Sequence, residues 1–302
     1  MTIIDGQPGA QPHVRGFYEK RTGSIQYVVA DPQTKRCAIV DPVLDFDPNS
    51  GGTATRSADE ILGWIAQQGY ELEWVLDTHP HADHFSAAGY LKDKTGVPTA
   101  IGEKVIGIQK LWQNIYNAED CCPADGSQWD RLFADGDRFK IGSMDVEVML
   151  TPGHTLASIT YVVGDAAFIH DTLFMPDGGT ARADFPGGSA HDLWTSIQRI
   201  LARPDATRLF TGHDYCPGGR EPKWESTVKQ QKSENIDLRK ASTQTAFIAL
   251  REAKDKKLPM PRLILQSLQV NLMGGRLPEP EDNGKRYLKI PLDAFDGVPW
   301  SE

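Results

Sequence analysis

The segment Thr78-His79-Pro80-His81-Ala82-Asp83-His84 is the most informative stretch of this sequence, because it holds three of the chain's eight histidines and one carboxylate. The apolar stretch Leu72 to Thr78 indicates a strand before it, and a helix is expected from Phe85 to about Lys94. Imidazole and carboxylate groups bind zinc, iron and similar ions, and a tight turn at a strand end can direct several of them to one point. A solvated polar turn is the alternative, but such compact clusters seldom have only a structural purpose. We therefore predict a metal site.

Three other polar side chains follow expected strands in the same way. His154 lies in a Gly/Pro turn, Asp171 ends an apolar run, and His213 follows the expected strand 208–211. Any one of these positions alone would be ordinary loop chemistry. Four such strand ends together predict one site, because loops at one edge of a sandwich can converge. His170 neighbours Asp171, but strand alternation is expected to turn it to the other face, where it would pack or hydrogen-bond.

The expected secondary structure consists of two β-rich halves, each followed by helices. Strands are expected at 24–30, 36–40, 72–78, 139–149 (a hairpin around Gly142), 159–163, 166–169 and 208–211. This order favours an α+β protein within the broad α/β class, with a four-layer αββα sandwich whose helices lie outside two sheets. No glycine-rich phosphate-binding motif stands in a strand-to-helix turn, so nucleotide binding has no support.

Several local features complete this expectation. Ser57 to Glu60 has the form of a capping box at the start of a helix that ends near Gly69, and Ser189 is expected to cap a second helix. Asp45 to Thr55 is interpreted as a polar, glycine-rich connector. After the strand 208–211 the chain is expected to be helical as far as Lys257, and then irregular. The segment 111–135 fits no part of the expected pattern.

Composition limits the partners. The net charge of −9 argues against a nucleic acid, since a phosphate-binding surface needs clustered Lys and Arg. No stretch approaches the roughly 20 apolar residues of a membrane helix, and no secretory signal is visible. The four cysteines form no C-x-x-C pair and are expected to be reduced thiols, so a cytoplasmic, soluble enzyme is predicted.

The order H-x-H-x-D-H, then a G-H-T turn, then an Asp at a strand end, then G-H-D, resembles the metal signature of the metallo-β-lactamase superfamily. The resemblance implies the αββα fold for a single domain over residues 1–302, with a helical and irregular extension at about 217–302 packed on it. It also implies that one ion could be held by His79, His81 and His154. A second could be held by Asp83, His84 and His213, with Asp171 between the two ions.

Two further stretches resemble persulfide dioxygenases, namely Ala181-Arg-Ala-Asp-Phe185 and the tail from Leu258-Pro-Met-Pro to Asn271 and Gly274. That resemblance implies one Fe(II) per chain held by His79, His154 and Asp171, with glutathione persulfide and O₂ as substrates and sulfite and glutathione as products. The residues that remain from the metal signature would then orient the ligands or order water: His81, Asp83, His84 and His213. Similar proteins are commonly homodimers.

Two candidate substrate contacts follow from the same resemblance. Arg182 could pair with a glutathione carboxylate, and its alternative is a salt bridge with Asp184. Tyr215 could place a hydroxyl near the metal, and its alternative is an aromatic lid residue without chemistry.

The main alternative function is a thioester hydrolase of the glyoxalase II type with two metal ions, which would use all seven ligand positions. The K-x-x-N-P-F-x-R glutathione-binding segment of that family is missing from this sequence. A metal-binding sensor without turnover is a third reading, from a different class. Metal content and turnover discriminate among the three.

Overall fold

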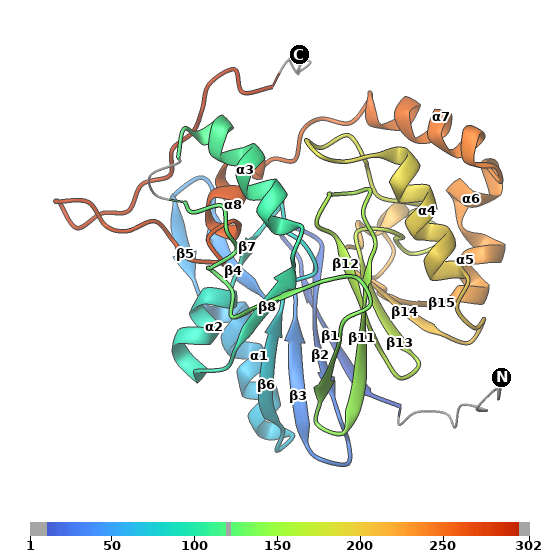
Figure 1. Cartoon of the computed structure of the whole chain (residues 1–302), viewed down its shortest axis with the longest axis horizontal. Coiled ribbons are helices and arrows are strands. Elements are labelled where there is room, and N and C mark those ends of the chain that lie inside the picture. The colour runs from blue at the N-terminus through green and yellow to red at the C-terminus, as the bar shows by residue number, and fades with distance from the viewer. Residues whose placement is uncertain (1–10, 119–121, 296–302) are drawn as a thin grey trace.

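Two six-stranded sheets stand face to face at the centre of the computed structural model, which describes residues 11–118 and 122–295 (Figure 1). The first sheet has the order β1-β2-β3-β6-β8-β9: β1 (His13–Glu19), β2 (Ser24–Ala30), β3 (Arg36–Val40), β6 (Glu71–Leu76), β8 (Thr99–Gly102) and β9 (Arg131–Phe133). The second runs β10 to β15 in chain order: β10 (Arg138–Ile141), β11 (Met144–Leu150), β12 (Ile159–Val163), β13 (Ala166–His170), β14 (Arg208–Thr211) and β15 (Glu225–Thr227).

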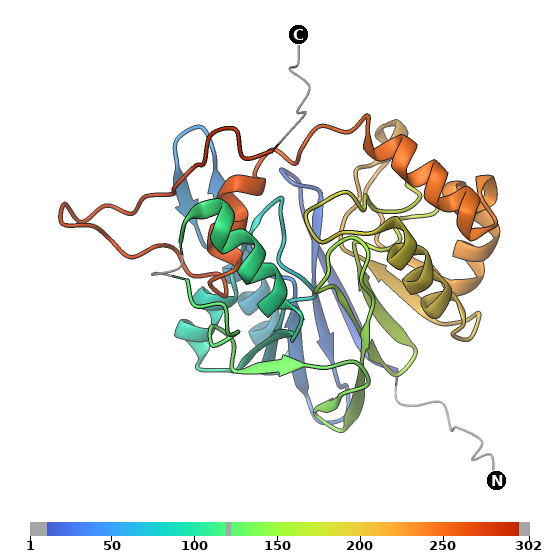
Figure 2. The ribbon, with the colours of Figure 1, turned by 45° about the horizontal axis from the view of Figure 1, so that its top comes forward.

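Helices cover the outer face of each sheet (Figures 1 and 2). On the first sheet lie α1 (Arg56–Gln67), α2 (Ala88–Thr95) and α3 (Val105–Tyr116). On the second lie α4 (Ala190–Leu201), α5 (Val228–Glu234), α6 (Ile236–Lys240) and α7 (Gln244–Asp255). The predicted four-layer αββα sandwich is confirmed.

The core between the sheets is aromatic. Tyr27 of the first sheet packs against Phe168 and Phe210 of the second, with ring centroids 5.4 and 5.5 Å apart. All three rings are buried, and Val146 and Tyr161 belong to the same cluster. Burial of this much apolar and aromatic surface is the main force that holds the two sheets together.

The expected connector between residues 45 and 55 is instead a hairpin. Its strands β4 (Val43–Asp47) and β5 (Gly52–Ala54) form a three-stranded sheet with β7 (Phe85–Ser86). The expected helix from Phe85 therefore begins later, at Ala88. Strand pairing with β4 holds Phe85 and Ser86 extended, and this tertiary contact overrides their local helical pattern.

The capping box expected at Ser57 is absent, because α1 begins at Arg56 and Ser57 lies inside its first turn. Asp45 of β4 supplies the missing cap from another element. Its carboxylate accepts the Ser57 backbone N–H at 3.0 Å and the Ser57 hydroxyl at 2.8 Å. The cap predicted at Ser189 is present, since its side chain accepts the N–H of Asp192.

The part of the chain after β14 differs from the expectation in two places. Residues 225–227 form β15, which pairs with β14 and so extends the second sheet. The tail, expected to be irregular, contains helix α8 (Ile264–Asn271), which lies beside β7. Flanking prolines and a short length hide this helix in the sequence, and burial of Ile264, Leu268 and Val270 stabilises it.

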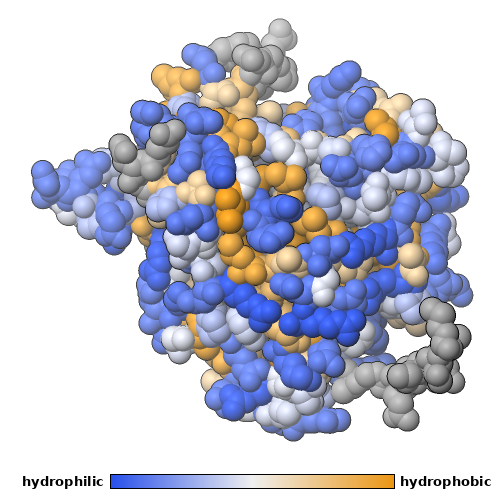
Figure 3. Space-filling model, in the orientation of Figure 1, coloured by the Kyte–Doolittle hydropathy of each residue, from blue (hydrophilic) through white to orange (hydrophobic). Residues whose placement is uncertain are grey.

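The surface in the view of Figure 3 is mainly hydrophilic, with an apolar strip near the middle of this face. No helix among the described residues is long and apolar enough to cross a membrane. Tyr215 and Leu258 are among the exposed large apolar side chains, and both line a cavity described below.

Candidate metal centre

The predicted strand ends meet at one edge of the sandwich. The segment between β6 and β7 carries His79, His81, Asp83 and His84, and the loops after β11, β13 and β14 bring the other predicted ligands to it. Ligand atoms of His79, His154 and Asp171 all lie within 4.8 Å of one another. These three side chains are buried, so the structure brings together the groups that the sequence placed on three separate strand ends.

Two histidines of this group have one ring nitrogen fixed by a hydrogen bond and the other directed to the group. His154 Nδ1–H donates to the backbone carbonyl of Arg182 at 2.9 Å. His79 Nδ1 lies 3.0 Å from the Thr78 hydroxyl, which itself donates to Asp41 at 2.8 Å. These contacts leave both Nε2 atoms unprotonated, which is the form that binds a metal ion.

A second group consists of His81, Asp83 and His84, whose ligand atoms also lie within 4.8 Å of one another. His81 Nε2 is 3.0 Å from Asp41 Oδ1, and His84 Nδ1 is 3.0 Å from Asp83 Oδ2. Buried ring nitrogens without a hydrogen-bond partner among the described residues include His79 Nε2, His81 Nδ1 and His84 Nε2. Burying such nitrogens costs free energy unless a ligand satisfies them, so the donor set fits a metal ion.

His213 lies between the two groups. Its Nδ1 is 2.7 Å from Asp171 Oδ1, and its Nε2 is 2.7 Å from Asp83 Oδ2. Burial alone would lower the pKa of His213, but the carboxylates of Asp171 and Asp83 outweigh it and hold that pKa well above its ordinary value. In this arrangement His213 acts as a cationic link between the two carboxylates.

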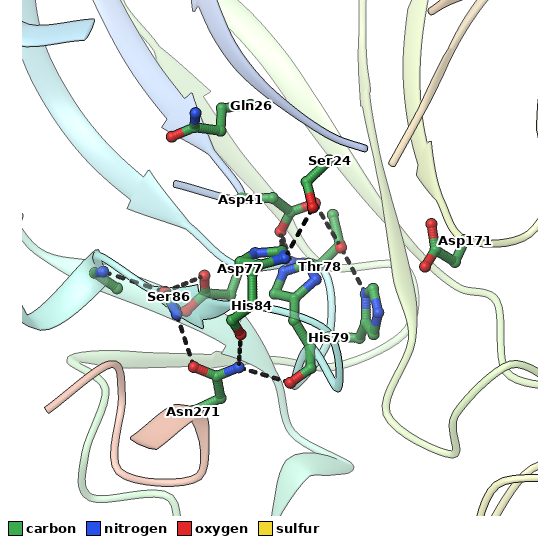
Figure 4. Close-up of polar contacts among 12 residues, drawn as sticks. Ser24, Gln26, Asp41, Asp77, Thr78, His79, His84, Ser86, Asp171 and Asn271 are labelled. Atoms are coloured by element: carbon green, nitrogen blue, oxygen red, sulfur yellow. Dashed lines mark hydrogen bonds and ion pairs between the residues drawn. The ribbon is translucent and has the colours of Figure 1, made fainter. Parts of the chain in front are cut away.

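Two residues that the sequence analysis gave no role support the histidine segment. Asp41 directly follows β3 and accepts hydrogen bonds from Thr78 and His81. Asn271, at the end of α8, donates from Nδ2 to the backbone carbonyl of His81 at 2.6 Å. It also donates to the backbone carbonyl of His84 at 2.7 Å, as Figure 4 shows. In the sequence, Asp41 could have been found only as a polar residue that follows a strand, and Asn271 only as the first residue of the N-x-x-G element.

The prediction that His170 points away from the metal residues is wrong. The β13–β14 register shifts between Phe168 and His170, and His170 has a φ of 42°. Its ring centroid therefore lies 5.3 Å from that of His79. The predicted hydrogen bonding is present, since His170 Nε2 lies 3.1 Å from the hydroxyls of Thr151 and Thr172.

The two predicted substrate contacts line the same cavity as His154 and Asp171, and its volume is about 1540 Å³. The Arg182 guanidinium pairs with both carboxylate oxygens of Asp184, at 2.6 and 2.8 Å, and donates to the Pro259 carbonyl. Tyr215 is 63% exposed, and its ring stacks on His213 at a centroid distance of 5.5 Å. Both side chains are thus positioned where a molecule in the cavity could reach them.

Residues 23–213 match the Metallo-beta-lactamase superfamily. With the αββα fold and the grouped histidines, this match shows that the chain belongs to that superfamily, as predicted. The chain is 65% identical over 300 residues to the "Beta-lactamase hydrolase-like protein" of Xylella fastidiosa. The alignment covers 99% of this chain and 69% of that relative. It is 46% identical over 279 residues to "Glyoxylase B2" of Dictyostelium discoideum, covering 92% and 96% of the two chains.

The chain is also similar, at lower identity, to two proteins that bear the name ETHE1. The chain is 28% identical over 213 residues to the mitochondrial "Persulfide dioxygenase ETHE1" of Homo sapiens, with 70% of this chain and 71% of that relative covered. The crystal structure of ETHE1 from Myxococcus xanthus superposes with a TM-score of 0.70 at 27% identity, covering 87% of this chain and all of that one.

Proposed function

We propose that this chain is a persulfide dioxygenase that binds one Fe(II) through His79, His154 and Asp171 and oxidises glutathione persulfide. The observation that carries the proposal is that these three groups converge while the neighbouring groups hydrogen-bond to one another or to Asp41. Two histidines and one carboxylate on one face are typical of non-haem Fe(II) oxygenases, because they leave coordination positions open for substrate and O₂. Iron would supply the one-electron chemistry that oxygen activation needs.

The reaction balances as glutathione persulfide plus O₂ plus water giving glutathione, sulfite and two protons. The outer sulfur is oxidised, dioxygen is reduced, and the bond between the two sulfurs breaks. His213, held between Asp83 and Asp171, keeps both carboxylates oriented and, as a cation, can supply a proton at Nε2. Arg182 and Tyr215 remain proposed substrate contacts, because both line the cavity that contains Asp171.

The resemblance of the R-x-D-F segment and of the tail to persulfide dioxygenases supports this assignment, as do the similarities to the two ETHE1 proteins. The alternative, a glutathione thioester hydrolase with two metal ions, is supported by a specific observation. His81 Nδ1 and His84 Nε2 have no partner among the described residues, so the second group could hold an ion. The similarity to "Glyoxylase B2" also favours that alternative.

Oxygen uptake by the Fe(II)-loaded protein on addition of glutathione persulfide, with sulfite assayed in the same sample, tests the proposal. We expect uptake with matching sulfite, and its loss in His154→Ala and Asp171→Ala. His191→Ala is the matched control, since His191 is exposed on α4 and lies outside the cavity. No uptake by a protein that demonstrably holds iron, together with hydrolysis of S-lactoylglutathione, would favour the hydrolase.

A further inference from the structure

The cavity next to the metal centre is lined by six cationic side chains: Arg21, Arg56, Arg182, Arg251, Lys254 and Arg262. Four of them are paired with a carboxylate within 2.8 Å: Arg21 with Glu19, Arg182 with Asp184, Arg251 with Asp255 and Lys254 with Asp237. By contrast, Arg56 and Arg262 make no side-chain hydrogen bond or ion pair with any residue that the structure describes, and both are exposed. These two guanidinium groups are therefore available to a ligand.

Both arginines stand on anchored backbone. Arg56 is the first residue of α1, where Asp45 accepts the N–H and the hydroxyl of the next residue, Ser57. Arg262 follows two prolines of the tail, and the carbonyl of Pro259 in the same stretch accepts a hydrogen bond from Arg182. Because each backbone is held in place, the conformational entropy that the protein loses when a ligand binds is mainly that of the two side chains.

Among the described residues, no carboxylate that lines the cavity pairs with Arg56 or Arg262. Glu19 and Asp45 are paired with Arg21, and Arg220 pairs with Asp177 and Asp214. Asp47 is the remaining carboxylate of the cavity outside the metal centre, and it forms no ion pair with a described residue. It accepts hydrogen bonds within its own turn from Asn49 and Ser50. The cavity thus offers two guanidinium groups that have no carboxylate partner among the described residues, on a chain whose net charge is −9.

Apolar surface lies in the same cavity, including Phe174, Phe185 and Met260. An elongated ligand could therefore place its sulfur at His154 and Asp171, its apolar bonds against these side chains, and its charged ends at Arg56 and Arg262. Arginine suits a carboxylate because its planar guanidinium forms two parallel hydrogen bonds to it.

We propose that Arg56 and Arg262 bind the carboxylates of the thiol substrate, and that this pair makes the enzyme selective for low-molecular-weight thiols with two carboxylates, such as glutathione, over neutral thiols. The inference rests on the proposed function for the position of the sulfur. It goes beyond that proposal because it assigns binding of the substrate carboxylates to two residues outside the family-like R-x-D-F segment.

Calorimetry with reduced glutathione and with its diethyl ester, in which both carboxylates are masked, tests the assignment without turnover. We expect the unaltered protein to bind glutathione about tenfold more tightly than the ester. Arg56→Gln combined with Arg262→Gln is expected to abolish that difference and to leave ester binding unchanged. Arg138→Gln is the matched control, because Arg138 is exposed on β10, lacks a side-chain partner among the described residues and lies outside the cavity.

Kinetics with glutathione persulfide gives the second measurement. In the double variant we expect KM to rise about tenfold with kcat within about twofold, since a remote contact acts mainly on binding. The inference is overturned if glutathione binding survives the double substitution, if the unaltered protein binds no glutathione, or if both ligands are weakened equally. Charge-dependent binding in a protein without oxygen uptake would instead refute the dioxygenase and leave the carboxylate site standing.

Discussion

The side-chain amide of Asn271 donates a hydrogen bond of 2.6 Å to the backbone carbonyl of His81, a residue 190 positions earlier in the chain. The same amide group also donates to the His84 carbonyl, and its oxygen accepts the N–H of Ser86. One side chain at the end of α8 thus satisfies three backbone groups of the segment that carries the histidines. Only 2% of Asn271 is exposed, so these three contacts are shielded from solvent.

Asn271→Ala is expected to lower metal affinity about tenfold, because the carbonyls that orient His81 and His84 lose their donor. The free energy of unfolding should fall by about 1–3 kcal/mol, since buried backbone groups are left unsatisfied. Metal retention during dialysis against graded chelator, with urea unfolding in parallel, measures both. Asn283→Ala, which alters an exposed residue of the tail, should change neither. Unaltered affinity in a folded Asn271→Ala protein would show that the contact does not position the ligands.

Asn271→Asp provides a sharper version of the same test. The carboxylate keeps an acceptor for Ser86 but faces the carbonyls of His81 and His84 without a donor. We therefore expect a metal affinity no better than that of Asn271→Ala. Recovery of affinity in the aspartate variant would indicate that the bond to Ser86 alone is what the metal segment requires.

Gly153→Ala is expected to displace the loop that carries His154. Gly153 has a φ of 134°, and an added Cβ would lie 2.3 Å from the backbone of Leu193 in α4. We predict that the free energy of unfolding falls by several kcal/mol and that bound metal is lost. The reason is that the backbone atoms of a helix can move aside only at a large cost in free energy. Gly136→Ala is the control, since its φ is also positive, at 83°, but an added Cβ meets nothing within 4 Å. Equal effects of the two substitutions on metal content would contradict the role of the close contact.

The proposed site predicts about one ion per chain in protein purified with iron. His154→Ala should abolish this metal, because it removes one of three ligands, whereas His84→Ala should retain about one ion per chain. Elemental analysis of both variants beside the unaltered protein gives the answer. Two ions per chain, falling to one in His84→Ala, would establish a binuclear site instead.

Asp31 predicts a pH-dependent contribution to stability far from the metal. Burial raises the pKa of its carboxyl, but hydrogen bonds from Ser143 and Thr34 and from the N–H of Gln33 outweigh burial and hold that pKa below its ordinary value. A carboxyl whose pKa is depressed in the folded state stabilises the protein above the unfolded-state value, about 3.9, and the benefit is lost as the pH falls below it.

Asp31→Asn should therefore lower the free energy of unfolding by about 2 kcal/mol at pH 7. The difference from the unaltered protein should shrink below about pH 4. Urea titrations at several pH values measure it. Asp145→Asn, an exposed position in the same β10–β11 hairpin that Asp31 joins through Ser143, should have little effect at any pH. If the difference in free energy of unfolding between Asp31→Asn and the unaltered protein grew in acid, the pKa of Asp31 would not be lowered in the folded state.

The parts of this protein that the sequence predicts are those set by local pattern. Runs such as 24–30 and 159–163 form the expected strands, and polar residues at strand ends mark the metal centre. Tertiary contacts explain the failures. Asp45 takes over the first turn of α1, so the capping pattern of Ser57 is not used. The register shift between β13 and β14 rotates His170, and no short sequence motif predicts such a shift.

The proposed substrate contacts were less predictable for the same reason. Arg182 stands out in the sequence because it lies in a segment similar to known enzymes, yet its charge is matched by Asp184. Arg56 lies in no motif, and nothing within the family-like tail singles out Arg262. The structure distinguishes both residues because the other cations of the cavity already have a carboxylate partner. Pairing of this kind depends on residues distant in the chain.

The contact between Asn271 and His81 also imposes an order on how the protein is made. A ribosome synthesises the histidine segment 190 residues before the asparagine that fixes its backbone. The growing chain can close its first sheet early, but the histidine segment obtains its final restraint only after α8 has emerged and docked. Tight capture of metal should therefore be among the last events of maturation, and a nascent chain halted before Asn271 should release its ion readily.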